Sequence, residues 1–598
     1  MPTPISRILD ARGATRVRIA PDGSWLGYVT DVTGTPQLWR VPTAGGATER
    51  LTFDCDRVGA YRISPDGKRI AYGADAGGNE RWQIWVMNAD GTGARQLTDQ
   101  DDRIHHLRGW TLDGRSLLVH TNLRDARYFD LLAYDIETGA SRVLHRHDGT
   151  AADATALEDG SVVIAVHRRR SDETHLLLVT PDGAARQLTP NDPRALHSIA
   201  GVVPGGFVIR SDRERDFVGL ATIALRDGAF AWLRTPEREV EDATTSGRLD
   251  AYVVNSDGYS EVRVADGDRD DVVKGLPSGS LAADLIGDGL ALQDGTVAVA
   301  WSRYDAPSSV FVARRGEPAR EVVPPVRAGL HPRELPESRL VEWPTFDGRR
   351  IPGFLLTKPG APEGPRPTVI DVHGGPEGQA RPNWNPRSVA LVAHGFNVLW
   401  PNVRGSSGYG KAYQALDDVR LRMDSVRDLD AAAAWLADSG IAPREKIGVI
   451  GQSYGGFMTL AAIAFFPERR WAAAVDLYGI ANFISFFEHT DSWRRPLRAV
   501  EYGDPLKDHD FLVSVSPITK LDAIRAPLMV IHGANDPRVP IGETEQIVAA
   551  LRARGQEVEY LRYEDEGHGL AKAKNRADAY PKVLAFFQRL MGPPPERQ

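Results

Sequence analysis

A self-similar unit of about 45 residues runs through the first half of the chain and constrains its fold more than any other feature. Seven segments share one pattern, in which a glycine-containing turn joins two alternating apolar runs, as in VRIAPDGSWLGYV and YRISPDGKRIAYG. Their turn glycines recur every 41 to 48 residues, and they are Gly23, Gly67, Gly114, Gly160, Gly206, Gly247 and Gly295. A period of this length is typical of β-propeller blades.

Each unit also carries two further short apolar segments, such as QLWRV followed by ATERLT in the first copy. Four short strands in each of seven units predict a seven-bladed ring without a long exposed edge. An array of β-sandwiches is the alternative, but it fits the strand count and the regular period less well. We therefore predict a short N-terminal segment over residues 1–14 and a propeller over residues 15–325.

The second half changes from repeated hairpins to strands that alternate with helices. A proline-rich stretch over residues 326–340 is predicted to be a linker. After it, apolar runs such as PTVIDV (367–372), KIGVI (446–450) and PLMVIHG (527–533) resemble strands buried on both faces. This alternation predicts an α/β-hydrolase domain over residues 341–598, built on a doubly wound and mostly parallel sheet.

The motif GQSYGG (451–456) stands between a predicted strand and a predicted helix. A lone GxSxG pattern arises by chance, but the order strand, sharp turn, helix is the context of a nucleophile elbow. Glycines at 451, 455 and 456 allow the strained turn, which lifts the Ser453 hydroxyl above the end of the sheet. Ser453 is therefore the candidate nucleophile.

A serine nucleophile needs a base to take its proton and an acid to orient that base. Downstream of Ser453, HGANDPRVP places Asp536 after one predicted strand, and EYLRYEDEGHGL places His568 after the next. This chain order, Ser then Asp then His, is that of α/β-hydrolases. Asp536 could also cap a turn and His568 could be a surface residue, but their joint placement favours a triad. His373 and His532 fall earlier in the assembly and are interpreted as structural.

Acyl transfer also needs donors for the oxyanion. The sequence HGGP (373–376) follows the strand PTVIDV, in the loop from which hydrolases of this fold take one N–H group. Gly375 is the candidate donor there, although a plain Gly-Pro turn is the alternative. Tyr454, the residue after the nucleophile, is the candidate for the second donor.

A propeller followed by HGGP, NVRGSSGYG (402–410), GQSYGG, HGANDPRVP and EGHG resembles the prolyl oligopeptidase family of serine peptidases. The resemblance covers essentially the whole chain, and its HGGP form is closer to the acylaminoacyl-peptidase and dipeptidyl-peptidase branch. It implies the triad Ser453, Asp536 and His568, the oxyanion donors Gly375 and Tyr454, and a propeller that restricts substrates to short peptides. Many relatives pack a longer N-terminal extension against the hydrolase, so such contacts are in doubt for this chain.

The resemblance implies a serine exopeptidase acting on short peptides, and other functions stay open. A carboxylesterase could use the same triad, and a dipeptidyl aminopeptidase is a further alternative. A scaffold without activity would leave the intact motifs unexplained.

An aromatic segment, IANFISFFEHTDSW, follows the strand after the nucleophile. We predict that it lines an apolar pocket for the residue before the scissile bond, with a preference for Leu, Met or Phe. Packing of these rings into a helix core is the alternative. The predicted lining residues are Phe483, Phe486, Phe487, Tyr454 and Val539.

Arginines are frequent in the loops between the second and third strands of consecutive blades, which propeller geometry should turn toward the active site. A guanidinium group binds a carboxylate bidentately, so these loops could hold the C-terminus of a peptide. Solvated pairs with neighbouring acidic residues are the alternative, and release of a blocked N-terminal residue is the rival activity. The arginines considered as substrate ligands are Arg168, Arg169, Arg170, Arg213, Arg215 and Arg538.

Composition limits the remaining possibilities. The net charge of −8 over 598 residues disfavours nucleic-acid partners, and no segment has the apolar length needed to cross a membrane. The single Cys55 and an N-terminus without an apolar signal region favour the cytoplasm. No metal-ligand spacing is present, so we expect neither a metal nor a cofactor, and a homo-oligomer stays open.

Overall fold

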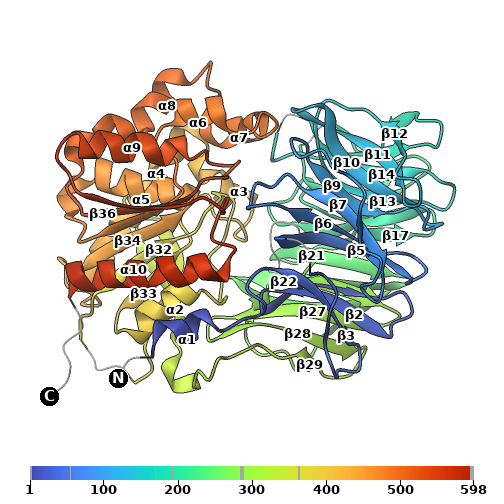
Figure 1. The fold of residues 1–598 in the computed structure, drawn as a ribbon, viewed down its shortest axis with the longest axis horizontal. Helices are drawn as coiled ribbons and strands as arrows, with labels where there is room; N and C mark the ends of the chain where they lie inside the picture. The colour runs from blue at the N-terminus through green and yellow to red at the C-terminus, as the bar shows by residue number, and fades with distance from the viewer. Residues whose placement is uncertain are drawn as a thin grey trace.

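The computed structural model describes residues 3–53, 56–168, 170–191, 194–282, 288–360 and 364–592. Cys55 lies outside these residues. The chain forms two bodies side by side, a propeller from the first half and an α/β domain from the second half (Figure 1). No helix in the described ranges is long and apolar enough to cross a membrane.

Seven antiparallel sheets form the propeller, in agreement with the prediction from the repeat. The first two blades are β1 (Ala14–Ile19), β2 (Trp25–Thr30), β3 (Gln37–Pro42), β4 (Glu49–Arg50) and β5 (Arg57–Ile63), β6 (Arg69–Asp75), β7 (Gln83–Asn88), β8 (Arg95–Gln96). The third and fourth are β9 (His105–Trp110), β10 (Ser116–Asp125), β11 (Tyr128–Asp135), β12 (Ser141–His145) and β13 (Thr150–Ala156), β14 (Val162–His167), β15 (His175–Val179), β16 (Ala185–Gln187). The fifth and sixth are β17 (His197–Val203), β18 (Gly206–Ser211), β19 (Gly219–Ala224), β20 (Phe230–Arg234) and β21 (Glu239–Ser246), β22 (Leu249–Ser256), β23 (Tyr259–Asp266), β24 (Arg269–Val272). The seventh is β25 (Ser280–Leu281), β26 (Leu290–Gln293), β27 (Thr296–Arg303), β28 (Ala306–Arg314) and β29 (Arg320–Val323).

The predicted turn glycines adopt positive φ in six of the seven blades, where a residue with a Cβ would be strained. In the fifth blade the positive φ belongs to Gly205, and Gly206 already begins β18. The seventh blade also departs from the regular pattern, because β25 and β26 both pair with β27 as two pieces of an inner strand.

The ring closes between the first and last blades without exchanging a strand. Backbone hydrogen bonds join Arg12 to Val326 in both directions at 2.9 Å, and the Val17 N–H donates to the Asp288 carbonyl at 2.7 Å. The Arg18 guanidinium adds an ion pair with Asp288.

An eight-stranded sheet forms the centre of the α/β domain, in the order β30-β31-β33-β32-β34-β35-β36-β37. Pairing is antiparallel from β30 through β33 and parallel over the rest of the sheet. The strands are β30 (Glu337–Pro344), β31 (Arg350–Thr357), β32 (Thr368–Val372), β33 (Asn397–Pro401), β34 (Ile447–Gln452), β35 (Ala474–Leu477), β36 (Leu528–Gly533) and β37 (Val558–Tyr563). β30 begins at Glu337, inside the stretch expected to be linker, because it pairs with β31 from Glu337 to Pro344.

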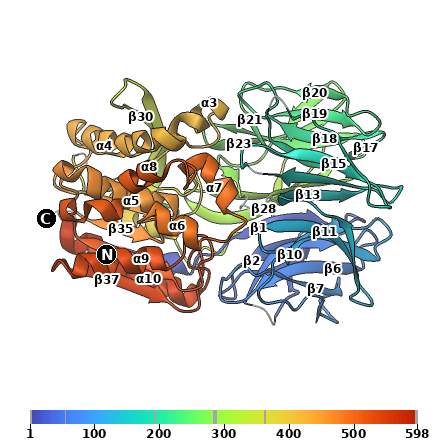
Figure 2. The same ribbon diagram turned by 90° about the horizontal axis from the view of Figure 1, so that it is seen from above.

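Helices cover both faces of this sheet (Figures 1 and 2). They are α2 (Pro386–Ala393), α3 (Lys411–Gln414), α4 (Arg422–Asp438), α5 (Tyr454–Phe465), α6 (Phe483–His489), α7 (Arg495–Tyr502), α8 (His509–Val515), α9 (Gly542–Arg552) and α10 (Ala573–Met591). Apolar side chains of α4 and α5 form one core with the sheet, and those of α2 and α10 form a second core on the other face.

The short N-terminal segment does contact the hydrolase, contrary to the doubt raised by its length. Helix α1 (Ile5–Leu9) lies beside α2 and α10 in Figure 1, and Ile8 is buried with Leu330, Val389 and Ala390. This short segment is long enough to contact the hydrolase because Ile5 and Ile8 pack directly against α2.

The loops between second and third strands face the hydrolase, as the blade geometry predicts. In the second blade, Arg81 pairs with Asp491 at 2.8 Å. In the fourth, the Ser171 hydroxyl donates to the Leu497 carbonyl at 3.2 Å, and in the sixth, the Asn255 amide donates to Gln379 at 2.6 Å. The two domains therefore meet over the ends of these loops.

Candidate active site

Ser453 stands in a strained turn between β34 and α5. Its φ of 58° and ψ of −120° are unusual for a residue with a Cβ. The turn is tight because Gly455 packs directly on the end of the neighbouring strand β32, where an added Cβ would lie 2.2 Å from the Val372 carbonyl oxygen. The backbone of Ser453 is fixed by an N–H bond of 2.9 Å to Leu477 on the neighbouring strand. This geometry is that of a nucleophile elbow.

Asp536 and His568 come together from the loops after β36 and β37. A hydrogen bond of 2.7 Å joins His568 Nδ1 to Asp536 Oδ2. The other carboxylate oxygen, Oδ1, accepts the backbone N–H groups of Arg538 at 2.8 Å and Val539 at 3.0 Å. The aspartate therefore has a fixed orientation, and it fixes one nitrogen of the imidazole in turn.

The charges of this pair follow from their surroundings. Burial raises the pKa of Asp536, but His568 and His532 outweigh burial and hold that pKa well below its usual range. Burial, together with Arg538, lowers the pKa of His568, and Asp536 and Glu80 offset this only in part. The resting site therefore pairs a carboxylate with a neutral imidazole, the form in which histidine accepts a proton.

The two other histidines near the sheet ends are held by neighbours, which agrees with their interpretation as structural. His532 is fully buried, with hydrogen bonds of 2.7 Å to the Thr544 hydroxyl and 2.9 Å to the Val539 carbonyl. His373 Nε2 bonds to the Ser406 hydroxyl at 2.9 Å.

The loop after β32 lies directly against Ser453. A Cβ added to Gly374 would lie 3.2 Å from the Cβ of Ser453, and Gly375 has a φ of 139°. Tyr454 directly follows Ser453 and is the first residue of α5. Its side chain points elsewhere, because the buried Tyr454 hydroxyl donates to Asp417 Oδ2 at 2.9 Å. The expectation that the Tyr454 ring lines the substrate pocket is therefore wrong.

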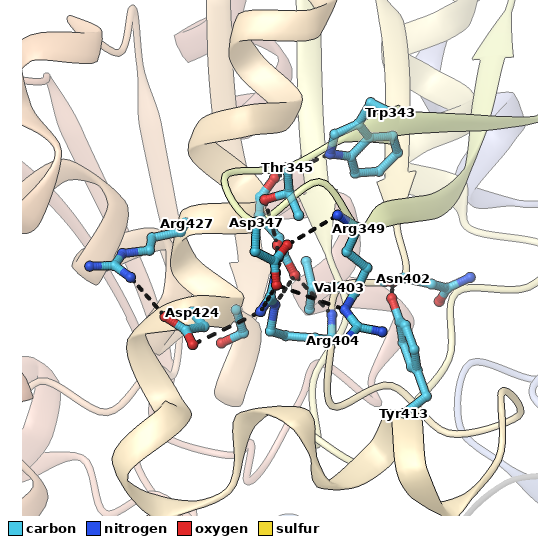
Figure 3. Close-up of polar contacts among 12 residues, drawn as sticks. Trp343, Thr345, Asp347, Arg349, Asn402, Val403, Arg404, Tyr413, Asp424 and Arg427 are labelled. Atoms are coloured by element: carbon cyan, nitrogen blue, oxygen red, sulfur yellow. Dashed lines mark hydrogen bonds and ion pairs between the residues drawn. The ribbon is translucent and has the colours of Figure 1, made fainter.

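A buried arginine, Arg404, anchors the loop NVRGSSGYG (402–410) (Figure 3). Ser406 of this loop bonds to His373, the first residue of the HGGP loop. Arg404 binds Asp428 through two nitrogens at 2.9 Å each and Asp347 through a third at 3.2 Å. The Asp428 carboxylate also accepts the Thr345 hydroxyl at 2.8 Å. Replacing Arg404 would leave Asp428 charged and buried, which typically costs about 3 to 5 kcal/mol.

A cavity of about 1000 Å³ lies between the two domains, and both contribute to its wall. Ser453, Gly375 and His568 line it from the hydrolase. Glu80, Glu239 and Glu241 are among the residues that line it from the propeller, although the sequence did not single them out. The alternation of Glu239 and Glu241 within REVED (238–242) was a usable signal, because residues two apart on a strand share a face.

Only part of the predicted aromatic pocket is present. Phe486 and Val539 line the cavity, together with Ile480 and Tyr502, which the sequence did not indicate. Phe483 and Phe487 are instead buried in the hydrophobic core, where Phe483 packs edge-on against Phe457 at 4.9 Å. The three phenylalanines share one face of α6, but only the Phe486 position meets the cavity.

The propeller arginines proposed as substrate ligands have local partners, and none of those described lines the cavity. Arg168 donates to Gln187 at 2.9 Å, and Arg170 pairs with Asp172 at 2.6 Å. Arg213 lies near Glu214 and over the Phe230 ring, and Arg215 lies over Trp232. Arg169 lies outside the described residues. Arg538 does line the cavity, where it pairs with Glu80.

The described chain brings three acidic groups together that lie apart in sequence, with ligand atoms within 4.8 Å of one another: Asp417, Asp418 and Glu501. The buried Arg422 forms ion pairs with Asp417 and Glu501. Because the Arg422 guanidinium already supplies positive charge beside these three acidic residues, we do not assign them as a metal site.

Comparison with known proteins places these motifs in a family. Residues 382–594 match the prolyl oligopeptidase family. The dipeptidyl aminopeptidase BIII of Pseudoxanthomonas mexicana is 26% identical over 96% of this chain and 86% of its own length. The acylamino-acid-releasing enzyme 2 of rice, Oryza sativa subsp. japonica, is 28% identical over 41% of this chain and 32% of its own.

Solved structures share the two-domain fold. A puromycin-hydrolyzing peptidase of Mycobacterium tuberculosis superposes with a TM-score of 0.86 at 21% identity, covering 100% of this chain and 97% of that one. The acylaminoacyl peptidase of Pyrococcus horikoshii superposes with a TM-score of 0.73 at 18% identity, covering 98% and 97%.

Proposed function

Because the chain is a serine peptidase of the prolyl oligopeptidase family, we propose that it hydrolyses short peptides with Ser453 as nucleophile, His568 as base and Asp536 as the orienting acid. The observation that carries this proposal is that the strained Ser453 turn lines the same cavity as His568. The Nδ1 atom of His568 is hydrogen-bonded to Asp536.

The proposed reaction follows from these positions. Neutral His568 takes the Ser453 hydroxyl proton as the oxygen attacks the peptide carbonyl, and Asp536 stabilises the resulting imidazolium. The backbone N–H groups of Gly375 and Tyr454 stabilise the oxyanion. His568 then protonates the leaving amine, and water releases the acyl group from Ser453 by the same steps in reverse order.

The cavity favours a short substrate with an apolar residue before the scissile bond. Residues of the propeller and of the hydrolase line the cavity around Ser453, which would restrict access for a folded chain. Phe486, Val539, Ile480 and Tyr502 supply apolar and aromatic surface in the cavity wall.

Charges in the cavity favour recognition of a free amino terminus over a free carboxylate. Seven described arginines line the cavity, and each already has a polar partner: Arg57 with Asp75, Arg210 with Ser198 and the Glu241 carbonyl, Arg381 with Glu241, Arg387 with Asp371, Arg498 with Glu377, and both Arg494 and Arg538 with Glu80. A peptide carboxylate would have to compete with these partners for the positive charge of the guanidinium. We therefore no longer favour the carboxypeptidase-like hypothesis.

Glu239 offers the opposite situation. Within the described chain no hydrogen bond or ion pair engages its carboxylate, and burial raises its pKa to about 7 despite Arg210. A peptide ammonium would stabilise the ionised form of Glu239, and Glu241 lies two residues along the same strand. We propose that Glu239 binds the amino terminus, as an aminopeptidase or dipeptidyl aminopeptidase requires, whereas Glu241 is already paired with Arg381.

The test uses one hexapeptide in four forms, with the N-terminus free or acetylated and the C-terminus free or amidated, and products are identified by mass spectrometry. We expect N-terminal fragments from both forms with a free amine, and much slower cleavage after acetylation. Glu239→Gln should lower kcat/KM for free-amine peptides by about tenfold or more, the value of a charged hydrogen bond. Glu261→Gln, which removes a half-exposed propeller acid, is the matched control.

Release of the acetylated first residue from either form would favour an acylaminoacyl peptidase instead. Loss of C-terminal residues only when the carboxylate is free would restore the carboxypeptidase hypothesis. Ser453→Ala should lower kcat/KM at least about a thousandfold for every substrate, including simple aryl esters. Ester hydrolysis by wild type without peptide hydrolysis would indicate a carboxylesterase.

A further inference from the structure

One propeller segment reaches into the hydrolase at the triad itself. The loop between β6 and β7, residues 76–82, is here called the blade-two loop. It carries Glu80, which is buried with only 7% of its surface exposed and lines the cavity. Glu80 has a φ of 57°, and its N–H donates to Asp75 Oδ2 at 2.9 Å. The backbone is thus held in an uncommon conformation that directs this carboxylate across the domain boundary.

The Glu80 carboxylate joins two arginines of the hydrolase. Its Oε1 accepts from Arg538 Nε at 2.8 Å, and its Oε2 accepts from Arg494 Nη2 at 2.8 Å. Arg538 belongs to the loop of Asp536 and donates its own N–H to the Asp536 carboxylate. Burial lowers the pKa of Arg494 to about 10, and Glu80 opposes that effect while Arg538 adds to it. Without Glu80, two like charges would share one buried site.

The same loop also touches the turn that carries His568. A Cβ added to Gly78 would lie 2.5 Å from the backbone nitrogen of Gly567, so the two backbones are in direct contact. The Asn535 side chain donates to the Gly77 carbonyl at 3.0 Å. Both loops that bear the proposed acid and base therefore rest on the blade-two loop.

We infer that the blade-two loop is a positioning element of the catalytic centre, in which Glu80 and Gly78 of the propeller hold the loops of Asp536 and His568 in register. The inference rests on the proposed function, because it takes His568 as the base. Glu80 is a positioning residue, since it acts on the triad through Arg538 and through its charge.

The electrostatic consequence has a definite sign. The groups that face His568 are Asp536 and Arg538 from the loop after β36, Glu80 from the propeller and the Tyr478 ring, 4.7 Å away. The negative charge of Glu80 raises the pKa of His568, and Arg538 lowers it. Removing Glu80 leaves Arg538 unopposed, so the pKa of His568 falls. The acidic limb of kcat/KM, which reports deprotonation of the base, then moves to lower pH.

The experiment compares the pH profiles of four variants of the full chain on one peptide substrate. Glu80→Gln should lower kcat about ten- to hundredfold with a smaller change in KM, and should shift the acidic limb to lower pH. Glu80→Asp keeps the charge but reaches less far, so it should retain the wild-type limb at a reduced kcat. Gly78→Ala should lower kcat by pushing on the His568 turn, with the charge unchanged. Glu49→Gln, at an exposed pair in the first blade, is the control for loss of one charge.

Three outcomes decide the inference. A wild-type acidic limb and kcat in folded Glu80→Gln would overturn it, as would a shift of equal size in Glu49→Gln. If Glu80→Gln fails to fold, unchanged kcat in Gly78→Ala overturns the positioning role. Activity in Ser453→Ala would contradict the proposed function itself, whereas an inactive Ser453→Ala beside a wild-type Glu80→Gln profile would contradict this inference alone.

Discussion

Asp476 shows how the interior beneath the nucleophile sets the charge of a single residue. It lies on β35, is fully buried, and accepts the Gly479 N–H at 2.9 Å through Oδ1. Its Oδ2 has no partner within the described chain. Burial raises the pKa of Asp476 to about 7, although His532 and the Gly479 N–H lower it. A carboxyl group in this position costs least when it is protonated.

This shift predicts a pH-dependent stability. Between about pH 4 and pH 7 the folded protein keeps a proton on Asp476 that the unfolded chain has released, so the free energy of unfolding falls as pH rises through that window. Asp476→Asn cannot lose this proton. We expect it to gain stability relative to wild type by a few kcal/mol at most at pH 8, and by much less at pH 5. Thermal denaturation at both pH values measures the difference.

The control is Asp510→Asn, which changes a fully exposed carboxylate in the same domain. It should leave the two denaturation temperatures close to those of wild type. If the stability difference between Asp476→Asn and wild type were the same at pH 5 and pH 8, the raised pKa would be contradicted.

The surroundings of a residue were predictable from the sequence where a motif fixes the local backbone. They were less predictable where tertiary packing determines which elements lie next to the residue. The strained turn at Ser453 follows from its flanking glycines and the adjacent strand and helix. The different surroundings of Phe483 and Phe486 do not, because both lie on one face of α6 and only the neighbouring elements distinguish them. Arg170 similarly has a sequence neighbour, Asp172, that competes for its guanidinium.

At the scale of elements, helix α5 approaches the sheet closely because its residues Gly455 and Gly456 face the strand ends. A Cβ at Gly456 would lie 2.4 Å from Asp476 Oδ1 and 2.6 Å from the Gly479 Cα. Contacts this short must be relieved by moving the helix or the strand end. Because Ser453 directly precedes this helix, such a shift moves the proposed nucleophile as well as changing the packing.

We therefore predict that Gly456→Ala costs about 1 to 3 kcal/mol of stability through overpacking and slows reaction of Ser453 with a fluorophosphonate probe. Denaturation and the rate of labelling measure the two effects. Gly542→Ala is the matched control, because a Cβ there meets no atom within 4 Å at the start of α9. Labelling at the wild-type rate in Gly456→Ala would show that the helix position does not govern the nucleophile.

Element types were predictable because the two halves have different periods. Hairpin turns mark the blades, and apolar runs mark the buried strands β32, β34 and β36. Boundaries were less predictable where pairing comes from a distant partner. The first residues of β30 resemble a linker in sequence, and they become a strand because β31 offers an edge.

The whole molecule depends on contacts that no local pattern encodes. Glu80 and Arg494 are 414 residues apart in sequence, and Asn255 and Gln379 are 124 apart. A period or a motif describes one domain at a time, so the sequence predicted two domains and a triad, but only a few residues of the cavity wall between them: Phe486, Val539 and Arg538. Glu239 and Glu241 left a weak signal in their alternation, but the contact of Glu80 with Arg494 and Arg538 depends on how the two domains meet.

The enclosed site leads to a prediction about substrate length. Both domains line the cavity of about 1000 Å³, which matches the upper end of the volumes of small-ligand sites. Interdomain ion pairs, such as Arg81 with Asp491 and Arg576 with Asp31, would have to break before a longer chain could enter. We expect kcat/KM to fall steeply when one cleavable sequence is lengthened from a pentapeptide to a forty-residue peptide, and a folded protein carrying that sequence in a loop to resist cleavage.

Comparable kcat/KM for the pentapeptide and the folded protein would contradict restriction by the cavity. The same comparison in Asp31→Ala adds a control, because it removes the interdomain pair with Arg576 without altering the blade-two loop and should reduce the difference between long and short peptides.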